Sequence, residues 1–433
     1  MSGTYVCEPE TLVDWIEDAR RACLLLFEDL EGDQLIGPGW TIVNPPLWEV
    51  GHVAWFYEKW ILRLHAGRDS IHDSADALWD SMAVHHPTRT TLPLPDRQRT
   101  LDYMRGVYDR VLDRIDTAWG EELAYLVRYS VHHEDMHTEA FTYTRQTLEY
   151  DVCDIGAAPA QDTIGGGPLP GDVELPGGEF ALGATADEPF VFDNEKWAHP
   201  ATVEPFGIAR APVTQAEYAE FVDDSGYTRR ELWDADGWTW RQEASAEHPV
   251  YWHKDTDGSW LRRHITDVRP LEPHLPVIHV NWHEAQAYCR WAGRRLPNEA
   301  EWEMAAAGAG AGGTKRRYPW GDDIPEGGMP ANMDWNTMGC VDVGAYADGD
   351  SAAGCRQMLG NVWEWTSSVF EPFPGFVPDM YKDYSIPWWH TRKVLRGGTW
   401  ASQSRMLRNT WRNYFTPDRR DVFGGFRTCA LDS

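Results

Sequence analysis

Two histidines four residues apart form the strongest chemical signal in the sequence. His133 and His137 lie in the segment HEDMHTE (133–139). On a helix, residues with this spacing share one face and lie about 5–6 Å apart. Two such imidazoles can bind one metal ion, although a lone pair with this spacing is also common among surface histidines. Glu139 lies about 200° around the helix from His137, which favours a supporting role over direct ligation.

A third ligand has to come from another element, and His52 is the candidate. It lies in the apolar segment EVGHVAW (49–55), and a helix bundle could direct its ring toward His133 and His137. A buried histidine of this kind is otherwise a hydrogen-bonded core residue. His132 competes as a ligand, although it lies about 100° off the shared face. Three imidazoles without a thiolate accept iron, zinc, copper or nickel, so the residue types leave the metal open.

Helices are the elements that would have to position these side chains. Apolar residues recur with helical spacing from about residue 12, over about 46–65, from about Asp96, and over about 121–148. Pro45 and Pro46 suit the entry of the second helix. We therefore expect four helices of about 20 residues or more, joined by loops, with a metal site built from inward-facing side chains.

The pattern changes in the Gly-, Ala- and Pro-rich segment 155–171, which is typical of a linker. Short apolar runs follow, broken by turn residues, with two short helical patterns near 214–224 and 282–293. The sequence predicts an α+β multidomain protein. Its expected parts are a helical bundle over 1–154, a linker over 155–171 and an irregular α+β domain over 172–433.

The composition of the chain limits the kinds of molecule that it is expected to bind. A net charge of −29 over 433 residues disfavours binding to nucleic acid or to anionic lipid. No segment approaches the 18 apolar residues of a membrane span, and the first residues lack a secretory pattern. The seven cysteines are scattered without CxxC spacing, as in cytosolic thiol proteins. We expect a cytoplasmic protein with small-molecule partners, and the oligomeric state stays open.

Several phrases in the second half resemble a known family. They are PVT with EY (212–218), RLPNEAEWE (295–303), GNVWEW (360–365), RGGTW (396–400) and GFR (425–427). Residues from about 170 to 433 resemble the formylglycine-generating-enzyme-like domain, a fold related to C-type lectins. The first half, with His52 and the HxxxHxE segment, resembles the DinB-like four-helix bundle. The pairing is similar to the ergothioneine-biosynthesis sulfoxide synthases, or hercynine oxygenases, and to the related selenoneine synthases.

The resemblance implies an Fe(II) ion bound by His52, His133 and His137, with O2 as co-substrate. The implied reaction joins a thiol or selenium donor to the imidazole C2 of hercynine, which is trimethylated histidine. The substrate pocket of the family falls near the C-terminus, and the full set of implied substrate contacts is Arg412, Asn413, Tyr414, Phe415, Met136, Phe376 and Arg89. Asn413 and Tyr414 are the main candidates for binding hercynine.

Departures from the family pattern bear on the donor. Phe415 stands where members that use γ-glutamylcysteine carry an acidic residue. Arg89 is the one arginine of a loop that carries two in those members, and Met136 replaces a glutamine found in some. We therefore expect cysteine or a selenosugar as the donor, rather than γ-glutamylcysteine.

A further departure bears on the proton donor. The catalytic phenol of the family falls near Phe376, which has no hydroxyl. Tyr381 or Tyr384 could supply the proton from the same loop, or a bundle residue could do so.

Two functions of other classes remain open. A copper-dependent formylglycine-generating oxidase would use Cys340 and Cys355 as a close pair and would leave the bundle histidines without a role. A non-catalytic, lectin-like binding module fused to a metal-binding bundle is the other. A structural Ca2+ in the second domain is a further open expectation.

Overall fold

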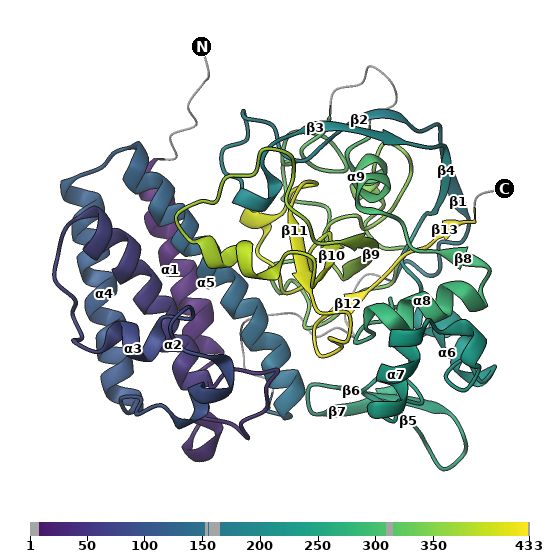
Figure 1. Cartoon of the computed structure of the whole chain (residues 1–433), viewed down its shortest axis with the longest axis horizontal. Coiled ribbons are helices and arrows are strands. Elements are labelled where there is room, and N and C mark those ends of the chain that lie inside the picture. Colours follow the sequence, from purple (N-terminus) through teal and green to yellow (C-terminus); the bar gives the residue numbers. More distant parts are fainter. Residues whose placement is uncertain (1–7, 152–154, 156–164, 309–314, 432–433) are drawn as a thin grey trace. The chain divides into compact units, whose positions relative to one another are not determined.

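Helices build the first of two compact units, residues 1–155, in this computed structural model (Figure 1). The structure describes residues 8–151, 155, 165–308 and 315–431. The helices of this unit are α1 (Pro9–Leu25), α2 (Pro46–Tyr57), α3 (Ala75–Trp79), α4 (Arg97–Thr117) and α5 (Glu121–Leu148). α2 packs against α3, α4 and α5, and α1 packs against α5. The predicted helical bundle is confirmed.

Prolines and capping residues set where the bundle helices begin. Pro9 and Pro46 occupy the first turns of α1 and α2, where a backbone N–H has no helical partner to lose. The Asp96 side chain accepts a hydrogen bond from the Arg99 backbone N–H and so caps α4. α1 is shorter than expected, with 17 residues. The second predicted helix changes after Tyr57 into a π-helical segment, η2 (Glu58–His65).

α2 is the central helix of the bundle, because each of its 12 residues is buried. Such burial on every side explains why its sequence is almost continuously apolar, rather than striped. His52 and Glu49 are the polar exceptions, and both side chains have hydrogen-bond partners. Within the described part of the chain, no helix has the length and apolar character needed to cross a bilayer.

Short strands and helices build the second unit, residues 156–433. One four-stranded sheet has the order β1 (Asp172–Leu175), β4 (Phe206–Ala209), β13 (Cys429–Ala430), β8 (Arg294–Arg295). The other has the order β11 (Arg412–Phe415), β10 (Lys393–Arg396), β9 (Trp363–Val369), β12 (Gly424–Gly425). Smaller sheets pair β2 (Gly178–Leu182) with β3 (His199–Val203), and β5 (Trp252–Lys254) with β6 (Trp260–His264) and β7 (Asp267–Pro270). The predicted α+β character is confirmed.

The helices of this unit are α6 (Gln215–Asp223), α7 (Ala235–Glu243), α8 (Trp282–Trp291) and α9 (Glu299–Ala307). α6 and α8 occupy the two segments with predicted helical patterns. α9 packs its fully buried Trp302 into the main core, with Phe180, Ile208 and Met358. The Trp302 indole donates to Glu364 of β9 (2.7 Å). Of the predicted linker 155–171, residues 156–164 lie outside the described residues.

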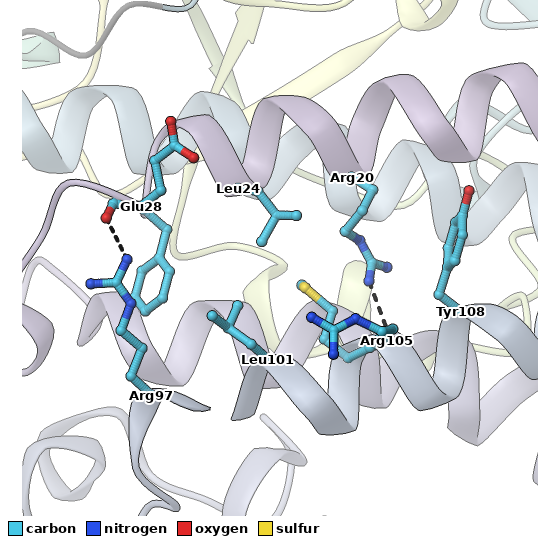
Figure 2. A pocket seen from close by; sticks show the side chains of 9 residues that line it. Arg20, Leu24, Glu28, Arg97, Leu101, Arg105 and Tyr108 are labelled. Atoms are coloured by element: carbon cyan, nitrogen blue, oxygen red, sulfur yellow. Dashed lines mark hydrogen bonds between the residues drawn. The ribbon is translucent and has the colours of Figure 1, made fainter. Parts of the chain in front are cut away.

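A cavity of about 280 Å³ lies between α1 and α4 of the bundle (Figure 2). Its walls combine apolar side chains with arginines, and the lining residues are Arg20, Leu24, Phe27, Glu28, Arg97, Leu101, Met104, Arg105 and Tyr108. The Arg20 guanidinium donates hydrogen bonds to Glu134 Oε1 (3.0 Å) and to the Met104 carbonyl oxygen (3.4 Å). None of the three candidate histidines lines this cavity, so it is separate from the site described next.

Candidate functional site

Three imidazoles converge inside the bundle, one from α2 and two from α5. The Nε2 atoms of His133 and His137 are 3.2 Å apart. The His52 ring centroid lies 5.0 Å from that of His133 and 4.7 Å from that of His137. One nitrogen from each ring lies within 4.8 Å of the other two. Two nitrogens bonded to one ion at about 2.1 Å lie about 3.0–3.4 Å apart, so the spacing suits a shared metal.

Hydrogen bonds hold two of the rings in one tautomer. His52 Nδ1 lies 2.7 Å from the Trp79 carbonyl oxygen, and His137 Nδ1 lies 2.5 Å from Glu49 Oε2. Both partners can only accept, so each Nδ1 carries a proton, and Nε2 is the nitrogen of each ring that remains for a metal ion. Metal-binding histidines characteristically donate their second N–H to a carbonyl or carboxylate in this way.

Aromatic rings fix the planes of the imidazoles. Trp48 stacks on His52 with centroids 4.5 Å apart, and Phe56 stacks on His133 at 3.7 Å. Stacking blocks rotation about the side-chain bonds, so the lone pairs stay aimed at one point. Such preorganisation lowers the entropic cost of binding an ion.

Burial also favours the protonation states that a metal needs. It lowers the pKa of His52 and of His133 well below the usual value, and the nearby His137 lowers both further. These two rings are therefore neutral at physiological pH, which is the metal-binding form. Burial alone would raise the pKa of Glu49, but the charge and hydrogen bond of His137, with smaller contributions from His52 and Asn44, lower it to about 2. Glu49 is thus a carboxylate.

The three rings differ in exposure. His52 and His133 are 1% and 2% exposed, whereas the His137 side chain is 21% exposed. His137 is therefore the most exposed of the three candidate ligands. Among the described residues, no other group of three or more His, Cys, Asp or Glu side chains brings its ligand atoms this close together.

The neighbouring polar residues of α5 lie outside the cluster. The His132 ring packs near Trp15 with centroids 6.0 Å apart, and its Nδ1 lies 3.7 Å from Asp135. Glu139 is buried but is not part of the group. Met136 is half-buried between the two histidines of the helix.

Arg89 has partners that the sequence did not suggest. It lies in the short helix η3 (His86–Thr91) and is 8% exposed. Its Nη1 donates to Asn44 Oδ1 (2.7 Å), and its Nη2 donates to the Val84 carbonyl (3.3 Å). The guanidinium also lies 3.9 Å from the ring centroid of Trp48.

The candidate substrate residues of the second unit divide between the two faces of β11. Side chains alternate along a strand, so Arg412 and Tyr414 share one face, and Asn413 and Phe415 share the other. Arg412 is buried in an ion pair with Glu299 (2.6 and 3.0 Å). The Arg412 guanidinium therefore stabilises the core of this unit. Asn413 and Phe415, on the opposite face of the strand, are half-buried.

Aromatic side chains pack around Tyr414 of β11 and around the predicted proton donors. Tyr414 stacks on Phe370 with centroids 3.9 Å apart and lies edge-on to Tyr384 at 6.1 Å. Tyr381 and Tyr384 are both buried, and burial raises the pKa of Tyr384, so its phenol keeps its proton. Phe376 packs edge-on against Trp389 at 5.2 Å. The structure thus brings Tyr384 to Tyr414, and it joins Phe376 to the same aromatic cluster through Trp389, which packs on Phe370 at 4.2 Å.

The two cysteines of the oxidase hypothesis are buried free thiols. Cys340 Sγ donates to the Asn361 carbonyl oxygen (3.3 Å), and Cys355 belongs to the main core around Trp302. Burial raises the pKa of Cys340 to about 12 and that of Cys355 to about 11. Copper binding needs thiolates, so these environments favour the histidine cluster as the metal site.

Sequence reasoning missed the residues that hold the rings. Glu49 lies three residues before His52 on α2, a spacing that places both on one face of a helix. A glutamate on an otherwise apolar stripe was the available signal. The Trp79 carbonyl left no signal, because a backbone acceptor can come from any residue type.

Comparisons with known proteins cover both units. Residues 159–431 match the sulfatase-modifying factor enzyme 1-like domain, and residues 15–146 match the DinB superfamily. A hercynine oxygenase of Mycolicibacterium smegmatis is 37% identical over 438 residues, covering 96% of this chain and 98% of that protein. One of Mycobacterium tuberculosis is 36% identical over 426 residues, covering 97% and 98%.

A formylglycine-generating enzyme of Streptomyces coelicolor is 35% identical, but the match covers 61% of this chain and 90% of that protein. The hercynine oxygenases, in contrast, match along nearly the whole chain, including the helical bundle with the three histidines. The chain therefore belongs to the hercynine oxygenase family and is an oxidoreductase.

Proposed function

We propose that the chain uses Fe(II) and O2 to join a thiol or selenium donor to the imidazole C2 of hercynine. The observation that carries this proposal is the convergence of His52, His133 and His137, with two rings oriented for ligation. When bound, the iron would supply redox chemistry toward O2 and would lower the pKa of the donor thiol. Three protein ligands leave positions for small molecules on the exposed side.

The residues of the chain would bind and orient the substrates. We assign Asn413 and Tyr414 to hercynine, whose trimethylammonium group requires a weakly hydrated, aromatic surrounding. Tyr381 or Tyr384 is the proposed proton donor, because both side chains are buried, and burial raises the pKa of Tyr384 and so keeps its phenol protonated. The cytoplasmic location is part of this proposal, and the five free cysteines among the described residues are consistent with a reducing compartment. A structural Ca2+ stays a prediction.

Donor choice follows from charge. γ-Glutamylcysteine carries two carboxylates and an ammonium group, and burying such charges unpaired costs several kcal/mol. Arg89, the single arginine of its loop, already donates to Asn44 and the Val84 carbonyl. Phe415 is apolar. We therefore propose cysteine or a selenosugar as the donor, and we expect γ-glutamylcysteine to have a much lower kcat/KM.

The test combines metal analysis, O2 uptake and product masses. Iron-loaded protein is incubated with hercynine and, in turn, with cysteine, γ-glutamylcysteine and a selenosugar. O2 uptake that requires hercynine, together with a hercynine–donor adduct, supports the proposal. O2 uptake without hercynine, or no uptake at all, contradicts it, and efficient turnover of γ-glutamylcysteine contradicts the donor assignment.

Histidine variants test the metal site itself. Replacing His52, His133 or His137 with alanine should abolish turnover and sharply lower the iron content. His132→Ala is the matched control, because His132 is equally buried on the same helix but lies outside the cluster. Loss of iron from His132→Ala, with iron retained by His133→Ala, would show that the ligand assignment is wrong.

A further inference from the structure

Glu49 has both of its carboxylate oxygens engaged beside the histidine cluster. Oε2 accepts from His137 Nδ1 (2.5 Å), and Oε1 accepts from Asn44 Nδ2 (2.6 Å). The residue is 5% exposed. Because Glu49 lies on α2 and His137 on α5, one side chain links the helix of the first candidate ligand to the helix of the other two.

Arg89 supports this link through a hydrogen bond to Asn44. Its Nη1 donates to Asn44 Oδ1 (2.7 Å), so Arg89, Asn44, Glu49 and His137 form one hydrogen-bonded chain. The same guanidinium lies over Trp48, whose ring stacks on His52. One buried cation therefore steadies two of the three imidazoles, His137 by hydrogen bonds and His52 by stacking.

We propose that Glu49, held by Asn44 and Arg89, is a positioning residue that sets the metal affinity of the histidine cluster. This inference rests on the proposed function. A carboxylate acceptor fixes the rotation of the His137 ring and makes its Nε2 a stronger donor, and such partners are worth about 10- to 100-fold in metal affinity. Three neutral imidazoles leave the charge of a divalent ion uncompensated, and Glu49 supplies one negative charge a single ring away.

The proposal also assigns a role to Arg89. An arginine whose Nη1 donates to Asn44 and whose Nη2 donates to the Val84 carbonyl belongs, in this proposal, to the scaffold of the metal site. It is not aimed at the carboxylates of a donor substrate. Its replacement should therefore weaken metal binding in the absence of any substrate.

The experiment measures Co2+ affinity of the full-length apoprotein under anaerobic conditions, by competition with a chelator. Glu49→Gln keeps the shape but removes the charge, and we expect about 10-fold weaker binding. Glu49→Ala should bind about 100-fold more weakly. The control is Glu58→Gln, because Glu58 is a fully buried glutamate on the adjoining helical segment that bonds Tyr103 and the Ile71 N–H but contacts none of the three histidines. It should bind Co2+ like the parent.

The result that overturns the proposal is parent-like Co2+ affinity in Glu49→Gln. Because this variant is nearly isosteric, it decides the question even where Glu49→Ala fails to fold. Equal losses in Glu49→Gln and Glu58→Gln would also overturn it, since they would reflect general damage to the bundle.

Arg89→Lys separates positioning from donor binding. Lysine keeps the charge but loses the fork that reaches Asn44. Weaker Co2+ binding, with the relative KM values of the donors unchanged, supports positioning. Unchanged Co2+ binding with a raised KM for carboxylate-bearing donors refutes it. Failure of the parent protein to bind Co2+ or Fe(II) would instead defeat the proposed function, so the two failures are distinguishable.

Discussion

Gly51→Ala tests whether close packing behind His52 builds the histidine site. A Cβ at Gly51 would lie 2.1 Å from Nε1 and 2.3 Å from Cε2 of Trp79. Trp79 is fully buried and stacks on Tyr103 with centroids 4.6 Å apart, so its indole has no free space to enter. The added methyl must therefore displace Trp79, whose carbonyl accepts the hydrogen bond from His52.

Two opposing effects set the change in the free energy of unfolding that Gly51→Ala should cause. Alanine is favoured over glycine inside a helix by about 1 kcal/mol, whereas overpacking a core costs about 1–3 kcal/mol. Gly106→Ala on α4 isolates the first effect, because a Cβ there meets only the end of the Arg110 side chain, at 3.1 Å. Gly51→Ala should thus be less stable than Gly106→Ala by about 1–3 kcal/mol.

Urea unfolding of the apoproteins, followed by circular dichroism, measures this difference. Co2+ titration of the same samples reports the site, and Gly51→Ala alone should bind more weakly, because the His52 ring loses its fixed acceptor. Equal stability and equal Co2+ affinity in the two variants would refute the reasoning. That result would show that the bundle accommodates the methyl group without moving the Trp79 carbonyl.

Three further predictions concern the second unit. Tyr381→Phe or Tyr384→Phe should slow product formation by about 10²-fold or more, with unchanged iron content, and parent rates in both would remove this loop from the mechanism. Burial raises the pKa of Asp193 from 3.8 to about 6, so the folded state keeps this proton at a higher pH than the unfolded state does. The free energy of unfolding should therefore fall as the pH rises from about 4 to 6, by up to about 3 kcal/mol. Asp193→Asn should lose this part of the pH dependence in a thermal-unfolding series, and an unchanged slope would contradict the assignment. Glu299 accepts from two buried arginines, so Glu299→Ala should cost about 3–5 kcal/mol in urea unfolding, and a loss below about 1 kcal/mol would contradict this.

The sequence predicted the bundle because its helices obey local rules. Asp96 caps α4 and Pro46 opens α2, at the positions where the apolar patterns indicated helix starts. α9 escaped prediction for the opposite reason. It is buried on nearly every side, so its residues carry no stripe, and the burial comes from strands distant in the sequence.

The histidine cluster shows the same division between local and tertiary information. The approach of His133 to His137 follows from helical geometry alone, and the position of His52 on a buried helix made it a reasonable partner. The acceptors behind these rings depend on tertiary packing. Trp79 reaches His52 only because Gly51 has no side chain, a fact that becomes visible once α3 is seen to pack on α2.

Arg89 shows how structure changes the meaning of a motif position. From the sequence it was a candidate contact for the donor, judged by resemblance to a loop that carries two arginines in relatives. In the fold it is buried, its Nη1 reaches Asn44, and its plane covers Trp48. A guanidinium that steadies two candidate ligands cannot be withdrawn to pair with a substrate carboxylate without loosening the metal site. If Arg89 positions the metal site, as proposed, its replacement should change metal affinity and leave the relative preference among donors unaltered.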